Sequence, residues 1–267
     1  MTAPFLASLH CYPIKSVGGF AMHEARLTDR GFAHDRRWML VDAAGRFLTQ
    51  RELPSMACLR TEPAEDGFTV IDHRDEEHLS LPWTLEEGPE PEVDIWGTRV
   101  RAREASPDRS AWFSERVGGA VRLVYMPDAT HRPIDERHAR GLTAFSDGFP
   151  YLIVSQASVD ALNERLEGPV SVDRFRPNLV IGGGVAHQED GWREVRIGTA
   201  RFSLVKPCAR CIITTTDQRT GERGREPLRT LASYRTVAGK VHFGMNAVAD
   251  TQGMVRVGDP ISIPDRP

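Results

Sequence analysis

Short runs of β-branched or alternating residues recur along the whole chain, separated by turn residues, and this rhythm most limits the possible fold. In the first hundred residues, the turns include Val17–Gly18–Gly19 and Glu65–Asp66–Gly67, and the runs between turns cover 5–14, 36–43, 67–73 and 98–104. Short strands at such spacing are typical of a small barrel or a curled sheet. The Pro- and Glu-rich segment 78–97 is predicted to be a loop on the barrel surface.

The second half adds helix signals to further strand-like runs. One helix is expected to begin at Ser106–Pro107–Asp108 and to end at Gly118–Gly119, a second to follow Ser155, and a third to open at Pro227. More strands are expected at 121–126, 178–183, 192–198, 200–205, 211–216 and 254–263. The sequence therefore predicts a mostly β fold of the α+β class. We place a domain boundary between residues 1–120 and residues 121–267.

Composition excludes several classes of protein. With 267 residues and a formal net charge of −3, the chain has no global basic field that would attract nucleic acid or an anionic membrane. No run approaches the roughly 18 apolar residues of a membrane span, and the first residues do not resemble a signal peptide. Four cysteines are too few for a disulfide scaffold of this size, so we expect reduced thiols and a cytoplasmic protein.

Two of those cysteines form the motif Cys208–Ala–Arg–Cys211, which is compatible with several kinds of site. A structural zinc would need more ligands at short spacing, and a redox disulfide normally opens a helix. The pair could also be two small core residues. Lys206, Arg210 and the polar residues 214–217 around the motif favour instead a thiolate that binds a soft transition metal.

Cationic residues next to turns form a second group of candidates. Lys15 and Ser16 precede Gly18–Gly19, Arg36 opens a strand-like run, and Arg176 and Asn178 precede another. Such charge-assisted donors beside exposed backbone N–H groups are suited to a phosphate monoester. Each fragment alone would equally fit a solvated turn or a surface salt bridge.

Taken together, the fragments resemble the MOSC superfamily. The chain is most similar to the mitochondrial amidoxime-reducing component and its bacterial homologues. The motifs that carry this resemblance are YPIKS (12–16), DRRWMLVD (35–42), SDGFPYLIVSQASVDALNERL (146–166), FRPNLVI (175–181), CARCIITTTDQRTGER (208–223), EPLRTLASYR (226–235), FGMN (243–246) and VRVGDP (255–260).

The resemblance implies an N-terminal β-barrel-like domain joined to a MOSC β-barrel domain, with the molybdenum cofactor (Mo-molybdopterin) in the cleft between them. It implies that Cys211, not Cys208, ligates molybdenum. The other residues it assigns to the cofactor are Lys15, Ser16 and Arg36 at the terminal phosphate, and Asp147, Gly148, Phe149, Arg176 and Asn178 near the pterin. Cys211 and Asp147 are the residues expected at the reaction itself.

The implied activity is reduction of small N-hydroxylated compounds, namely hydroxylamines, amidoximes and N-hydroxylated bases. A cofactor carrier, a sulfur-transfer protein with a persulfide on Cys211, and a cofactor-free scaffold stay open as alternatives. The proton donor could be Asp147, His34 or water. The chain has neither the cysteine run of a plant-type ferredoxin nor a dinucleotide-binding Gly-x-Gly-x-x-Gly motif. We therefore expect a separate electron donor such as a ferredoxin, a flavoprotein or a cytochrome b5-like protein.

Overall fold

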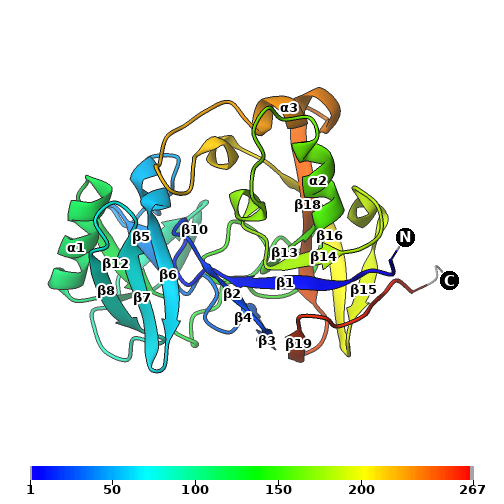
Figure 1. Ribbon diagram of the computed structural model, residues 1–267. Coiled ribbons are helices and arrows are strands. Elements are labelled where there is room, and N and C mark those ends of the chain that lie inside the picture. Colours follow the sequence, from blue (N-terminus) through cyan, green and yellow to red (C-terminus); the bar gives the residue numbers. More distant parts are fainter. Residues whose placement is uncertain (1, 265–267) are drawn as a thin grey trace.

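The structure is a computed structural model that describes residues 2–264. Strands dominate it, and the α-helices of the described part are α1 (Pro107–Val117), α2 (Gln156–Asn163) and α3 (Leu228–Tyr234). The predicted mostly β fold of the α+β class is confirmed. Figure 1 shows two lobes side by side, with both described ends of the chain on the same side of the molecule.

The larger lobe is built on a nine-stranded sheet in the order β2-β1-β14-β13-β18-β16-β15-β20, with β17 beside β18. Only β13 and β14 run parallel within it. The Leu6 amide donates to the Asp259 carbonyl and the Ile261 amide to the Pro4 carbonyl, so the sheet curls and brings the region of β20 beside β1. Its strands are β1 (Phe5–Cys11), β2 (Phe20–Met22), β13 (Tyr151–Ser155), β14 (Leu179–Gly182), β15 (Glu194–Ile197), β16 (Ala200–Ala209), β17 (Thr236–Val237), β18 (Lys240–Ala249) and β20 (Ile261–Ser262).

Helices α2 and α3 cover this sheet on the side seen at the top of Figure 1. The interface is apolar and consists of Leu152, Val154, Val159, Leu162, Phe175, Leu231 and Phe243. The spacing of Val159 and Leu162 on α2 places both on one helical face. Packing of this face anchors the segments that enter and leave the centre of the molecule.

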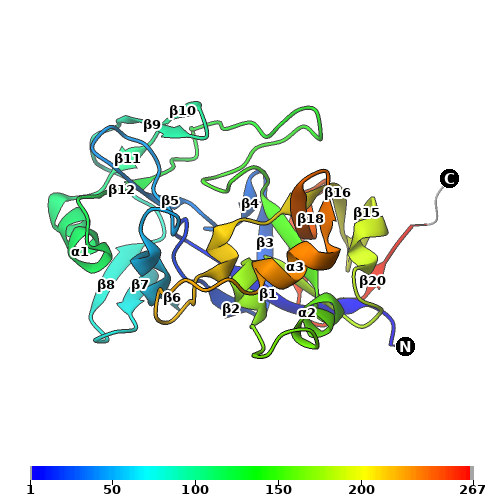
Figure 2. The ribbon, with the colours of Figure 1, turned by 90° about the horizontal axis from the view of Figure 1, so that it is seen from above.

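The smaller lobe holds α1 and three small sheets around a core that includes Trp38, Phe68 and Phe113. Figure 2 shows β9 and β10 at one edge of this lobe. Its strands are β5 (Trp38–Val41), β6 (Leu59–Ala64), β7 (Gly67–Asp72), β8 (His78–Pro82), β9 (Glu92–Ile95), β10 (Thr98–Arg101), β11 (Arg103–Glu104) and β12 (Arg122–Tyr125).

The two halves of the sequence are interleaved in space. Strand β1 pairs with β14 from the second half, and β3 (Glu24–Thr28) pairs with both β4 (Gly31–Phe32) and β19 (Gly253–Arg256). The predicted domain boundary between residues 120 and 121 stays a prediction.

Among the described residues, no helix has both the length and the apolar character that crossing a membrane requires.

Two local predictions were wrong. Residues 78–97 were expected to be a loop, yet they contain β8 and β9, because buried Leu81, Val93 and Ile95 alternate with outward-facing residues. Residues 211–216 were expected to be a strand, yet Ile212–Thr215 form one turn of 3₁₀ helix. The Thr214 hydroxyl donates to the Cys211 carbonyl and the Thr215 hydroxyl to the Ile212 carbonyl, so these side chains complete the turn.

A buried carboxyl beside α2 gives a stability prediction. Glu189 is fully buried and accepts hydrogen bonds from the Ser155 amide and the Ser158 hydroxyl. Burial raises the pKa of Glu189 above its ordinary value of 4.5, against the opposing effect of these hydrogen bonds. Because the folded-state pKa is raised, ionisation costs stability as the pH rises from about 4.5 through the folded-state pKa.

We therefore expect Glu189→Gln to melt at a higher temperature than the wild type at pH 8, by about 2–4 °C for each kcal/mol relieved. The advantage should vanish below about pH 4, where the wild-type carboxyl is protonated. Thermal melts at both pH values test this, with the exposed Glu167→Gln as control. A Glu189→Gln protein that melts lower at pH 8 would show that the carboxylate is needed in its ionised form.

Candidate functional site

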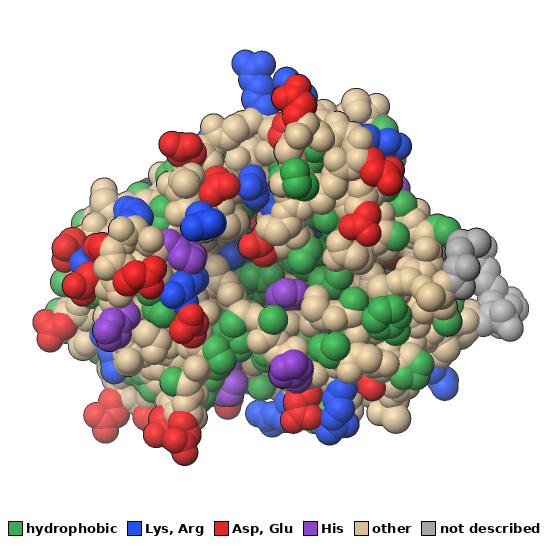
Figure 3. Space-filling model, in the orientation of Figure 1, with side chains coloured by type: hydrophobic (Ala, Val, Ile, Leu, Met, Phe, Trp, Pro, Cys, Tyr) green, Lys and Arg blue, Asp and Glu red, His purple; other side chains and the backbone are tan. Residues whose placement is uncertain are grey.

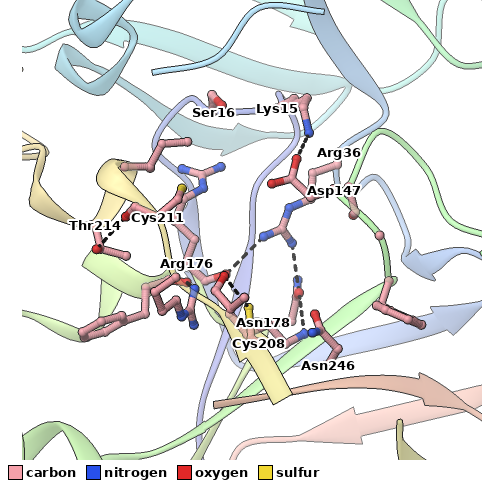
Figure 4. A pocket seen from close by; sticks show the side chains of 18 of the residues that line it. Lys15, Ser16, Arg36, Asp147, Arg176, Asn178, Cys208, Cys211, Thr214 and Asn246 are labelled. Carbon is pink, nitrogen blue, oxygen red and sulfur yellow. Dashed lines mark hydrogen bonds and ion pairs between the residues drawn. The ribbon is translucent and has the colours of Figure 1, made fainter. Parts of the chain in front are cut away.

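A cavity of about 190 Å³ lies where the segment after β1, the loop before β13 and the end of β16 converge. Figure 3 shows a hollow near the middle of the molecule, where charged side chains border hydrophobic ones. All nine site residues expected from the sequence line this one cavity: Lys15, Ser16, Arg36, Asp147, Gly148, Phe149, Arg176, Asn178 and Cys211. Their roles stay predictions, but the structure brings them together, as Figure 4 shows for seven of them.

The lining is strongly cationic. One carboxylate, Asp147, faces six cationic side chains, which are Lys15, Arg36, Arg51, Arg174, Arg176 and Arg210. Four guanidinium nitrogens are buried without a hydrogen-bond partner among the described residues: Arg51 Nη1, Arg174 Nε, Arg176 Nη2 and Arg210 Nη2. A buried charged donor without a partner is costly, so this lining is suited to an anionic ligand with several acceptor oxygens.

Three hydrogen bonds to neighbouring protein groups hold the Arg36 side chain. Its Nη1 donates to Asp35 over 2.6 Å and to the Asn178 side-chain oxygen over 2.9 Å, and its Nη2 donates to the Arg176 carbonyl over 3.1 Å. The guanidinium groups of Arg36 and Arg176 lie 4.5 and 4.3 Å from the centroid of the Tyr12 ring. Burial lowers the pKa of Arg176 to about 10, with the nearby Arg36 acting in the same direction.

Asn178 is 1% exposed and its amide is already occupied by protein groups. Besides accepting from Arg36, its oxygen accepts from the Leu152 amide over 3.3 Å, and its nitrogen donates to the His10 carbonyl over 3.2 Å. The hydrogen bond from Arg36 lets Asn178 orient the Arg36 guanidinium at the cavity.

Lys15 and Asp147 form an ion pair in the lining of the cavity. Lys15 is 4% exposed and also donates to the Phe145 carbonyl over 2.9 Å. Desolvation by the surrounding protein opposes ionisation of Asp147, whose side chain is 56% exposed, but Lys15, Arg51 and a hydrogen bond from Trp96 outweigh it and hold its pKa well below the ordinary value. Asp147 is therefore a carboxylate, and an acceptor of hydrogen bonds, near neutral pH.

The two cysteines of the motif have different surroundings, although both line the cavity. The sulfur of Cys211 accepts a hydrogen bond from Arg51 Nη2 at 3.2 Å. The Cys208 thiol donates weakly to the Ala209 carbonyl at 3.9 Å, and burial raises its pKa. An arginine donor suits an anionic sulfur, whereas burial keeps Cys208 a neutral thiol.

No group of three or more His, Cys, Asp or Glu side chains within residues 2–264 could hold a metal ion. A metal at Cys211 would therefore need most of its ligands from a bound group, and the anion-binding lining is suited to such a group.

Backbone strain is concentrated at the same site. Ser16, Arg36 and Arg176 have φ angles of 65°, 49° and 55°, in the left-handed region that non-glycine residues rarely adopt. Strain of this kind is characteristic of ligand-binding positions. In contrast, a Cβ added to Gly148 would meet no atom within 4 Å, so the space in front of its backbone is open.

Sequence reasoning missed Arg51 and Trp96, which lie in segments without a recognisable motif. Arg51 contacts Cys211 across 160 positions of sequence, and Trp96 contacts Asp147 across 51, so no local pattern could reveal either. His34, considered as a proton donor, does not line this cavity; it packs against Trp83 at a second, apolar cavity.

Comparisons with known proteins match both parts of the chain. The family model described as MOSC N-terminal beta barrel domain matches residues 3–120, and the model described as MOSC domain matches residues 141–262. Mitochondrial amidoxime-reducing component 1 of Mus musculus is 34% identical, with 96% of this chain and 81% of the relative covered. Its counterpart in Homo sapiens is 32% identical, with 96% and 82% covered.

Molybdenum cofactor sulfurase of Oryza sativa subsp. japonica is 35% identical over 90% of this chain. The chain spans only 32% of the length of that relative. The similarity to the sulfurase is therefore confined to one part of a much longer protein.

Proposed function

The chain belongs to the family whose members join a MOSC N-terminal beta barrel domain to a MOSC domain, and we propose that it is a molybdenum-cofactor-dependent reductase of N-hydroxylated compounds. The molybdenum cofactor is the cofactor of this family. The proposed substrates are small hydroxylamines, amidoximes and N-hydroxylated bases. In the overall reaction, an R–NHOH group takes up two electrons and two protons and yields R–NH₂ and water.

One observation carries this proposal: Cys211 shares its cavity with six cationic side chains, four of which have a buried nitrogen that finds no hydrogen-bond partner within residues 2–264. An anionic cofactor with a phosphate group and a soft metal fits both the charge and the thiol. When bound, such a cofactor supplies a metal that exchanges two electrons with the substrate. Cys211 would ligate the metal, and Lys15, Ser16 and Arg36 would hold the phosphate.

The remaining site residues would bind and orient the cofactor. Arg176, whose Nη2 has no partner in the described part of the chain, and the open backbone at Gly148 would face the pterin, together with Phe149. Asn178 would keep Arg36 in place. Because Lys15 and Arg51 depress the pKa of Asp147 against the opposing effect of desolvation, Asp147 would accept a hydrogen bond from the substrate N–OH group rather than supply a proton. With His34 outside the cavity, water is the remaining source of protons among those considered.

A second candidate function is a cofactor carrier or sulfur-transfer protein, with a persulfide on Cys211 and no reductase activity. It is favoured by the sulfurase relative, which is 35% identical over 90% of this chain. Elemental analysis of protein from a molybdenum-replete host distinguishes the two. About one molybdenum per chain, with reduction of a hydroxylamine by reduced viologen, supports the reductase. Persulfide sulfur without molybdenum supports the carrier.

We expect the isolated chain to require a separate one-electron donor, such as a ferredoxin, a flavoprotein or a cytochrome b5-like protein. The segment after Gly182–Gly183–Gly184 is polar and continues into a short 3₁₀ turn and β15, so it does not form the glycine-rich turn and helix of a dinucleotide site.

Reduced viologen, or an added donor protein, should therefore support turnover of a hydroxylamine substrate, and NADH or NADPH alone should support none. The measurement is NADH oxidation followed by absorbance, with and without substrate. Steady oxidation of NADH by the pure chain, dependent on an N-hydroxylated substrate, would contradict this prediction and reveal another electron-entry site.

A further inference from the structure

Trp96 is 53% exposed. No other Trp or Phe side chain within residues 2–264 is as exposed. It lies in the two-residue turn between β9 and β10, where Ile95 pairs with Thr98. Figure 2 shows this hairpin at the edge of the smaller lobe, beside the long loop that leads to β13. Neither the expected site residues nor the proposed function uses this side chain.

The turn itself is unfavourable for tryptophan. Trp96 and Gly97 have φ angles of 55° and 82°, so both central residues are left-handed, as in a type I′ hairpin turn. Such turns favour Asn–Gly, and a bulky residue at the first position is strained. A strained residue at the edge of a site is a reason to look for a function.

The contacts of Trp96 point to the cavity. Its indole N–H donates to the Asp147 carboxylate over 3.2 Å, and the Arg51 guanidinium lies 5.0 Å from its ring centroid. Arg51 in turn reaches the Cys211 sulfur and lies 3.7 Å from the second Asp147 oxygen. Phe47 supports the ring from another side at 4.8 Å. Trp96 is thus fixed at the cavity edge while much of its surface stays exposed.

We propose that Trp96 determines specificity for planar aromatic substrates: its exposed ring receives the aromatic part of the substrate at the cavity mouth, and Arg51 orients the polar end toward Cys211. The indole N–H is already used by Asp147, so the exposed ring surface offers stacking and apolar contact rather than a hydrogen bond. This inference rests on the proposed function for the identity of the polar end as an N-hydroxyl group.

The first part of the test uses stability. Trp96→Asn places the preferred residue in the turn, so we expect a melting temperature equal to or above that of the wild type. Trp96→Phe keeps a ring and should behave like the wild type in substrate affinity. If Trp96→Asn melts several degrees lower and binds substrates as the wild type does, the tryptophan is a structural residue and the proposal is overturned.

The second part measures binding and turnover on the cofactor-loaded protein. In calorimetric titrations, the dissociation constant of benzamidoxime should be about tenfold higher for Trp96→Asn than for the wild type. The dissociation constant of N-methylhydroxylamine, which lacks a ring, should differ by less than about twofold between the two proteins. The ratio of kcat/KM values for the two compounds should shift by the same factor with the viologen donor.

The outcomes separate this inference from the proposed function. Benzamidoxime that binds through Trp96 but is not reduced would refute the reductase and leave the aromatic site standing. Wild-type protein that does not bind benzamidoxime would overturn the inference, even if N-methylhydroxylamine is reduced. Equal losses of affinity for benzamidoxime and N-methylhydroxylamine in Trp96→Asn would also overturn the inference. So would a loss of turnover in Trp96→Asn that appears only with a protein electron donor and not with viologen.

Discussion

Cys211→Ala should lose bound molybdenum and the viologen-linked reduction of hydroxylamines, by at least about 100-fold, whereas Cys208→Ala should keep most of both. Loss of groups that merely support metal ligands already costs about 10–100-fold, so loss of the thiolate ligand should cost more. Cys211 also has the Arg51 donor at 3.2 Å, while burial raises the pKa of Cys208 and keeps it a thiol.

Molybdenum content by elemental analysis, measured beside activity, checks this prediction. Cys208 is a matched control because it lies three residues away and lines the same cavity. Circular dichroism shows whether each variant is folded. A folded Cys208→Ala protein without metal, beside a Cys211→Ala protein that retains it, would reverse the assignment of the ligand.

Elements specified by local signals could be predicted from the sequence. Helix α1 begins at Pro107 and ends before Gly118, which is left-handed at the C-cap, as the proline and glycine signals indicated. Strand β7 matches the predicted run at 67–73 within one residue. These signals act over a few residues, so neighbours in space cannot easily override them.

The two wrong local predictions, at 78–97 and 211–216, share a physical cause. Local composition suggested one secondary structure, whereas pairing with neighbouring strands determined another. The threonines at 214–216 have high strand propensity, but the pairing of β16 with β18 ends at Ala209 and Arg210, and the Thr214 and Thr215 hydroxyls bond nearby carbonyls instead. In 78–97, prolines and glutamates concealed the alternating buried residues that pair β8 with β7 and β9 with β10.

The expected site residues came from a family resemblance, and their assembly into one cavity is a property of the fold. Charge balance explains why Arg51 could not be recognised beforehand. An arginine in a sequence is most often a solvated surface residue, and only burial without a partner marks it as a binding group. The left-handed backbone at Ser16 and Arg36 is likewise visible only in three dimensions.

Arg36→Ala should weaken retention of the cofactor by about tenfold or more, because a charge-assisted hydrogen bond to a phosphate contributes roughly 1.5–3 kcal/mol. Arg36 is a strong test since its side chain is only 12% exposed and is held by Asp35 and Asn178. The geometry of the guanidinium is thus set before a ligand arrives, and binding does not have to order it.

Arg37→Ala is the matched control. Arg37 is adjacent in sequence and also buried, but it donates to the Met126 carbonyl and pairs with Asp128, away from the cavity. Its loss should lower the melting temperature and leave the cofactor content unchanged, whereas Arg36→Ala should lose cofactor during gel filtration. A folded Arg36→Ala protein with wild-type cofactor content would show that Arg36 does not bind the phosphate. Equal cofactor loss in both variants would trace the effect to general destabilisation of the segment between Asp35 and β5.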